Sequence, residues 1–216
     1  MIAEPLQMIV AAAHPGATPA PGFTKEQIAA AEQRLGVVLP EPLKDFFAAI
    51  GGSPDLMGVD YRMLPPEKLR VDGTHLIFCA ENQGLEEFGI PLEEVKAAEE
   101  NPNVDVRPKN AVKWFGEAGS LSAFLLGMTA WQAVLSLPEK GRCPFPQKQL
   151  KKLLAFFEPV GGPDVRIGAH RFGLVDRKNA IVAAYLYNTE TLYVGSSRDA
   201  ALEALEKKSR LDFESL

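Results

Sequence analysis

A two-helix stretch from Phe23 to Gly52, FTKEQIAAAEQRLGVVLPEPLKDFFAAIGG, constrains the fold more than any other part of the chain. Thr24 and Gln27 have the spacing of a capping box, so we expect a helix to begin directly after Thr24. Gly36 suits the left-handed turn that ends such a helix. Pro40 suits the start of a second helix, where a missing N–H costs nothing. Both helices carry apolar stripes, but neither carries a group that would do chemistry.

The rest of the first half mixes strand and helix patterns. Residues 1–13 are predicted to form a short helix, followed by a Pro/Ala/Gly linker at 14–22. Ser120 is predicted to cap a long apolar helix that Pro138 ends. The predicted strands are 75–80, 85–90, 104–106 and 112–115, with a turn at 81–84.

The second half begins with a break at 141–146 and a predicted helix at 147–157. A β-meander and a last helix from Asp199 follow; the meander strands are 166–175, 180–187 and 191–195. We therefore expect an α+β fold, with a mixed or mainly antiparallel sheet flanked by helices and a C-terminal β-meander and helix extension.

The break near residue 138 suggests a division of the chain into three parts. These are an N-terminal segment and linker (1–22), a first domain (23–138), and a C-terminal α+β extension or subdomain (139–216). The alternative is that the second half extends the sheet of the first.

Composition sets outer limits on function. The 216 residues are 46% hydrophobic and 24% charged, as in ordinary globular proteins. A net charge of −5 disfavours a nucleic-acid binder. No run is long enough to span a membrane, and the apolar patch at 8–13 lacks the basic flank of a signal peptide. Two cysteines do not make a secreted disulfide framework, so we expect a cytoplasmic protein.

The order of motifs resembles the SUKH superfamily. The first helix ends in Leu35-Gly36, and Leu39-Pro40 introduces a Leu- and Phe-rich helix that ends at Gly51-Gly52. A strand, the turn at 81–84, a second strand, Trp114 and the Ser-Leu-Ser-Ala-Phe-Leu helix at 120–125 follow in the family order. The resemblance covers about residues 23–137 and leaves 140–216 unmatched.

This resemblance implies a binding protein without a catalytic residue. Bacterial members of the superfamily look mostly like immunity proteins that neutralise polymorphic toxins, often nucleases, and fungal relatives regulate cell-wall glucan synthesis. No cofactor is implied. Because one scaffold serves many partners, the fold alone does not identify the partner of this chain.

Charge is concentrated in one segment. Residues 81–105 hold eight acidic side chains and a single lysine, a net charge of −7 against −5 for the whole chain. We interpret this run as an acidic surface for a basic partner, such as the substrate-binding face of a nuclease toxin. A solvated surface is the alternative interpretation. The residues assigned to partner binding are Glu86, Glu87, Glu93, Glu94, Glu99 and Glu100.

Other candidate sites have a simpler structural explanation. The histidines lack metal-ligand spacing, so no metal site is predicted. Cys143 follows Arg142, which could activate a thiol, but a loop thiol is the simpler interpretation. Trp114 could anchor an interface but suits a core position. A basic patch for an anionic ligand is possible at Lys148, Lys151 and Lys152, against a solvated helix face.

Three functional hypotheses follow. The leading one is a non-enzymatic immunity protein that occludes the active face of a toxin, with a protein partner and no nucleic acid or membrane. The second is an intracellular regulatory or scaffold protein with an endogenous partner. The third is an enzyme whose site forms between the two halves, around Cys143, His75 or His170.

Overall fold

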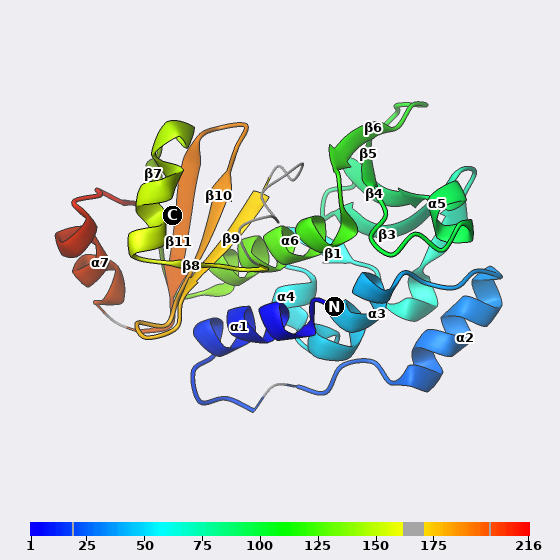
Figure 1. The fold of residues 1–216 in the computed structure, drawn as a ribbon, viewed down its shortest axis with the longest axis horizontal. Helices are drawn as coiled ribbons and strands as arrows, with labels where there is room; N and C mark the ends of the chain where they lie inside the picture. The colour runs from blue at the N-terminus through cyan, green and yellow to red at the C-terminus, as the bar shows by residue number, and fades with distance from the viewer. Residues whose placement is uncertain (19, 162–170, 199) are drawn as a thin grey trace.

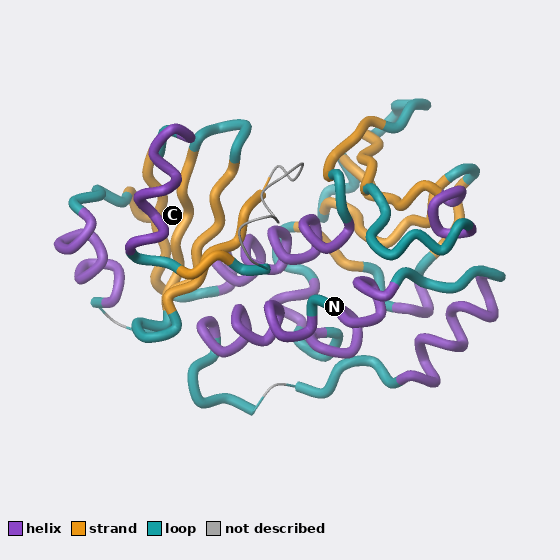
Figure 2. Tube along the Cα trace, in the orientation of Figure 1, coloured by secondary structure: helices purple, strands orange, loops and turns teal. Residues whose placement is uncertain are grey.

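A computed structural model describes residues 1–18, 20–161, 171–198 and 200–216. Two antiparallel sheets stand at opposite ends of the molecule, with helices between and beneath them (Figures 1 and 2). The predicted α+β class is confirmed. The described helices are α1 (Ala3–Ala13), α2 (Lys25–Leu35), α3 (Glu41–Ile50), α4 (Pro54–Met57), η1 (Pro66–Lys68), α5 (Leu92–Lys96), α6 (Leu121–Ser136), η2 (Gln147–Ala155) and α7 (Ala201–Ser209).

The first sheet, sheet A, contains the strands of residues 61–118. Their order is β1-β3-β4-β5-β6, and β2 also pairs with β3. The strands are β1 (Tyr61–Met63), β2 (Arg70–Asp72), β3 (His75–Glu81), β4 (Glu86–Pro91), β5 (Val104–Pro108) and β6 (Phe115–Ala118). The predicted strands at 75–80, 85–90 and 104–106 are thus present.

The second sheet, sheet B, contains the strands of the C-terminal part, in the order β12-β7-β11-β10-β9-β8. The predicted meander is present in its described part, while its residues 166–170 and the proposed helix start at Asp199 lie outside the described residues. Because this sheet is separate, the second half does not extend sheet A. The strands are β7 (Glu139–Pro144), β8 (Glu158–Pro159), β9 (Arg171–Asp176), β10 (Ile181–Leu186), β11 (Thr191–Ser196) and β12 (Glu214–Ser215).

The opening two-helix stretch folds as its caps predict. Thr24 Oγ1 accepts a hydrogen bond from Gln27 N–H, and the Gln27 side chain accepts one from Thr24 N–H, which completes the capping box. Gly36 takes the left-handed conformation, with φ of 70°. Phe23 packs edge-on against Phe47 at the start of the stretch, with ring centroids 5.8 Å apart.

Helix α6 is the centre of the molecule. Ser120 caps it as predicted, by accepting a hydrogen bond from Ala123 N–H. It is apolar on nearly every side because α1, α3 and α4 pack around it together with strands of sheet B. Gly127 and Gly173 permit the close approach of α6 to β9. A Cβ on Gly127 would lie 2.7 Å from the Arg171 carbonyl oxygen, and one on Gly173 would lie 2.9 Å from Ala130 Cβ.

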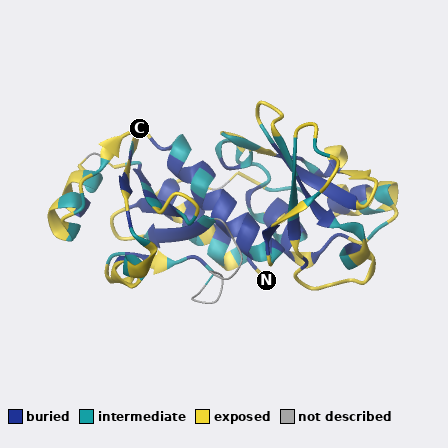
Figure 3. Cartoon of the chain, turned by 90° about the horizontal axis from the view of Figure 1, so that it is seen from above, coloured by how far each residue is buried: buried dark blue, intermediate teal, exposed yellow. Residues whose placement is uncertain are grey.

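Sheet B has a core on each face. Alternate residues of β10 point to opposite faces of the sheet and so belong to different cores. Val182 and Ala184 belong to the core around α6. The other face carries Ile181, Ala183 and Tyr185, which belong to a smaller cluster with residues of η2 and α7. The larger core is one cluster with members from both halves of the chain, the first Ile2 and the last Ala184. Figure 3 shows buried segments through the middle of the molecule. Both halves of the chain therefore share apolar packing around α6.

Two local predictions are wrong. Residues 141–144 are part of strand β7, which pairs with β11 and β12, so the predicted break there does not exist. The predicted strand at 112–115 is a loop, and β6 begins only at Phe115. In this loop Trp114 stacks on His75 of the sheet, whereas Val112 is 93% exposed, so the two side chains do not alternate as in a half-buried strand.

Candidate functional site

The outer face of sheet A carries most of the polar side chains that the fold brings together. Alternation along the strands sends Phe88 towards Phe124 of α6 and its neighbour Glu87 to the opposite side. Paired residues share a face, so Ala80 and Arg107, the partners of Glu87, lie on the same outer face. We define this outer face as Arg62, Arg70, Asp72, His75, Ile77, Ala80, Glu87, Gly89, Asp105 and Arg107.

Trp114 lies over this outer face. Its ring stacks on His75, with centroids 4.0 Å apart and an interplanar angle of 18°. Gly89 makes room for it, since a Cβ at that position would lie 3.1 Å from Trp114 Cη2. The Arg107 guanidinium lies 4.7 Å from the indole centroid, in cation–π range. Trp114 is thus half-buried against the sheet, neither fully in the core nor a free interface anchor.

His75 is buried with hydrogen bonds to both ring nitrogens. Nδ1 is 2.9 Å from Thr74 Oγ1, and Nε2 is 3.0 Å from Asp105 Oδ2. A buried imidazole needs such partners because an unpaired polar group is costly. The contacts fix the ring as a platform for Trp114.

Arg107 is the centre of an ion-pair network on the same face. It donates hydrogen bonds to Asp72 and to Glu87, the latter at 2.8 Å, and Glu87 also pairs with Arg70. The hydrogen bonds to Glu87 and Asp72 raise the pKa of Arg107. The hydrogen bond and charge of Arg107 lower the pKa of Asp72 below its usual 3.8. The arrangement holds three strands in register and balances the charge of Glu87.

Two hollows open on this side of the sheet. One, of about 410 Å³, is lined in the described part of the chain by four basic and two acidic side chains, among them Arg62, Lys109 and Glu87. The other, of about 480 Å³, contains Thr74, His75 and the exposed Glu93. We call them the arginine hollow and the histidine hollow.

The six glutamates predicted to bind a partner do not form one patch. Glu86 and Glu87 belong to β4, whereas the other four follow its far end, on α5 and the turn after it. Glu87 is only 28% exposed and paired with two arginines. The carboxylate of Glu94 accepts two hydrogen bonds from Asn103, one from its backbone N–H at 2.7 Å and one from its side-chain amide at 2.8 Å.

Three of the six glutamates are exposed and close in sequence. Glu93, Glu99 and Glu100 have no ion pair with any residue that the structure describes. The Glu94–Asn103 bonds and a hydrogen bond from Glu99 N–H to the Glu94 carbonyl oxygen, 3.1 Å long, hold the segment that carries them. We call Glu93, Glu99 and Glu100 the acidic edge.

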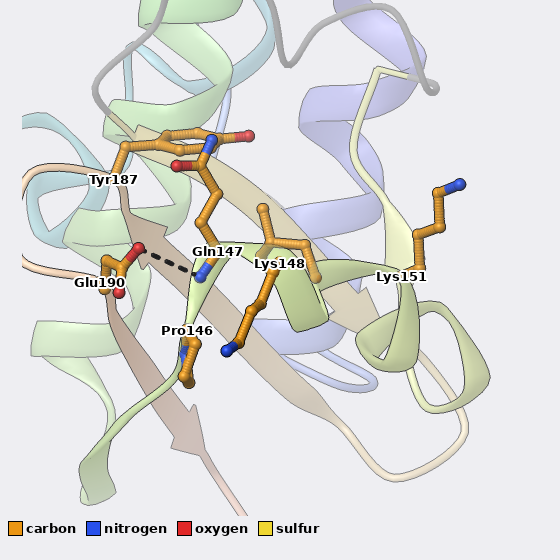
Figure 4. A pocket seen from close by; sticks show the side chains of 7 residues that line it. Pro146, Gln147, Lys148, Lys151, Tyr187 and Glu190 are labelled. Atoms are coloured by element: carbon orange, nitrogen blue, oxygen red, sulfur yellow. Dashed lines mark hydrogen bonds between the residues drawn. The ribbon is translucent and has the colours of Figure 1, made fainter.

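A larger hollow lies away from sheet A, beside the start of η2. It encloses about 980 Å³ and is lined in part by Lys148, Lys151, Tyr187 and Glu190. Figure 4 shows the two lysine side chains pointing in different directions. Glu190 Oε1 accepts a hydrogen bond from Gln147 N–H at 3.4 Å. Lys148 and Lys151 therefore do not converge on one anion position, and Lys152, the third lysine of the possible basic patch, is not among the described residues that line this hollow.

The cysteines are not activated thiols. Cys143 lies in β7 and is 3% exposed, so its interpretation as a loop thiol is wrong. Burial, with Asp212 and Glu206 nearby, raises its pKa to about 11. Cys79 is fully buried, and neither cysteine forms a disulfide. His170, the third residue of the enzyme hypothesis, lies outside the described residues.

Among the residues that the structure describes, no group of three or more His, Cys, Asp or Glu side chains is placed to hold a metal ion. Within the same part of the chain, no helix has the length and apolar character needed to cross a membrane.

Comparison with known proteins gives no match: no family model fits the chain, and no curated protein or solved structure is significantly similar to it. The SUKH resemblance continues to rest on the motifs quoted above.

Sequence reasoning missed the arginines of the outer face. Arg62 and Arg70 precede β3, whereas Arg107 lies well beyond it in the chain, and strand pairing brings the three onto one face. The clue in the sequence is the alternation of side chains, because Asp105 and Arg107 flank Val106 in a predicted strand. Glu87, which pairs with Arg70 and Arg107, is one of the glutamates predicted to bind a partner.

Proposed function

We propose that this chain is a non-enzymatic, cytoplasmic protein-binding module of the SUKH type, and that it acts as an immunity protein. It would neutralise a polymorphic toxin by covering the basic face that the toxin uses for its substrate. The single observation that carries this proposal is the acidic edge. Its three exposed carboxylates stand on a braced segment, without an ion pair to any described residue.

The acidic edge has the properties that electrostatic recognition needs. A fixed group of like charges raises the rate of encounter with a basic surface and selects against acidic ones. Lys96 is the one basic residue at positions 81–105, so the formal charge of this segment is negative. Of the six glutamates first assigned to the partner, Glu87 is the least suited, because two arginines already balance its charge.

The test begins with the genes beside the one that encodes this chain. An immunity protein is expected next to a toxin gene, and co-expression with that toxin should restore growth. Size-exclusion chromatography should then show a complex. Growth unchanged by this chain, together with no complex, would refute the proposal.

A second candidate function is supported by the histidine hollow. Thr74 Oγ1, the His75 ring and Asp105 Oδ2 form a continuous hydrogen-bonded chain in its wall. That order of hydroxyl, imidazole and carboxylate occurs in acyl-transfer enzymes. Against it, His75 is 6% exposed and covered by Trp114. Hydrolysis of an activated ester that Thr74→Val abolishes would favour this candidate over the immunity protein.

A further inference from the structure

The arginine hollow results from one row of paired residues across four strands. Arg62 of β1 pairs with Ala80 of β3, Ala80 with Glu87 of β4, and Glu87 with Arg107 of β5. Paired residues point to the same side, with Cβ atoms about 5 Å apart. Because Ala80 offers only a methyl group, the row has a gap between Arg62 and Glu87. This gap opens into the hollow of about 410 Å³.

Positive charge exceeds negative charge around this gap. Among the residues that the structure describes, the charged side chains that line it are Arg62, Arg70, Arg107, Lys109, Glu86 and Glu87, with a net formal charge of +2. Glu87 is shared by Arg70 and Arg107. The side chains of Arg62 and Lys109 have no hydrogen bond or ion pair with a residue in the described ranges.

We propose that the arginine hollow binds a carboxylate side chain from an acidic segment of the protein partner. Arginine recognises carboxylates through two parallel hydrogen bonds, and a carboxylate near Arg62 and Lys109 would balance their charge. The proposal rests on the proposed function in that the occupant is a protein. The partner then meets sheet A with a basic patch at the acidic edge and an acidic residue at the arginine hollow.

The test uses the tryptophan beside the hollow as a reporter. The chain has two tryptophans, so Trp131→Phe leaves only Trp114, which lies against Arg107. The probe is an acetylated, amidated hexaglutamate peptide, with hexalysine and inorganic phosphate as comparison probes. Isothermal titration calorimetry with the unmodified protein gives a second measurement if Trp131→Phe does not fold.

Hexaglutamate should change Trp114 fluorescence in a saturable way, and added salt should weaken the effect. Arg62→Ala combined with Lys109→Ala should lower the affinity about tenfold or more. The matched control, Lys148→Ala with Lys151→Ala in the other hollow, should leave it unchanged. Glu93→Gln, Glu99→Gln and Glu100→Gln should not weaken it either.

Three results would overturn the inference. They are no saturable response to hexaglutamate by either method, an equal loss in the Lys148/Lys151 control, and saturation of the signal by phosphate alone at the same concentration. None of these results depends on a toxin. If no complex with the toxin forms, the proposed immunity function is refuted, but the result of the hexaglutamate titration is unaffected.

Discussion

The indole of Trp114 lies flat on the imidazole of His75, with ring centroids 4.0 Å apart. This contact joins the β5–β6 loop to β3, two segments on opposite sides of β4. Arg107 lines the arginine hollow and His75 lines the histidine hollow, so Trp114 contacts one lining residue of each. A displacement of Trp114 is therefore expected to disturb both hollows.

Gly89→Ala is expected to displace Trp114. The new Cβ would lie 2.9 Å from His75 Cβ and 3.1 Å from Trp114 Cη2, so one of them must move. We expect a red-shifted tryptophan emission and a loss of about 1–3 kcal/mol in the free energy of unfolding. Gly116→Ala is the control, because a Cβ there meets nothing within 4 Å. Equal behaviour of the two variants would contradict the packing described.

Asp72→Asn should lower stability near neutral pH but not in acid. The pKa of Asp72 is lowered in the folded state, chiefly by its hydrogen bond from Arg107. Its contribution is then present above the unfolded pKa and is lost as the pH falls through the folded pKa. Since Asp72 is about half exposed, we expect at most about 1 kcal/mol. Urea unfolding of both proteins from pH 7 downwards measures this effect. A stability difference between the original protein and Asp72→Asn that grows as the pH falls would contradict the prediction.

Both thiols should be inert in the folded protein. With a pKa of about 11, Cys143 would be a reactive thiolate in only about one molecule in a thousand at pH 8. Its burial and that of Cys79 also exclude reagents. A disulfide reagent should not label either thiol rapidly in the native protein. It should label both thiols rapidly when guanidinium chloride has unfolded the protein. Rapid labelling of Cys143 in the folded state would contradict this prediction and would support an enzyme that uses Cys143.

Glu117→Ala should destabilise the junction between the two sheets. Glu117 of β6 pairs with Arg171 of β9 at 3.2 Å, and the two side chains are 8% and 15% exposed. Removing the carboxylate leaves a largely buried guanidinium uncompensated, at a cost of about 3 kcal/mol. Glu203→Ala breaks an exposed pair with Lys207 and should change stability by less than about 0.5 kcal/mol. Similar costs for the two changes would show that the junction contributes little.

Local signals in the sequence predicted local structure well. The capping box at Thr24, the left-handed Gly36 and the Ser120 cap each depend on residues within four positions, and all are present. Strand β7 was missed for the opposite reason. Gly141 and Pro144 resemble a break, but pairing with β11, some 50 residues later, makes this segment a strand. Distant pairing can override local propensity in this way.

The candidate site was predicted only in part. The acidic run is continuous in sequence, yet β4 carries Glu87 into an arginine network and leaves Glu93 beyond its other end. Six residues of strand span about 20 Å, which is enough to divide one run of charge into two environments. The arginine hollow could not be predicted, because its row of residues exists only once four strands have paired.

The central claim is that the acidic edge binds a basic protein partner. The most direct measurement is the affinity of the purified chain for the toxin domain encoded beside it, by isothermal titration calorimetry. Glu93→Gln, Glu99→Gln and Glu100→Gln together should weaken binding at least about tenfold and reduce its salt dependence. Glu4→Gln, Glu139→Gln and Glu203→Gln, which remove three exposed carboxylates elsewhere, should leave it unchanged. Equal affinity of the two triple variants would contradict the account.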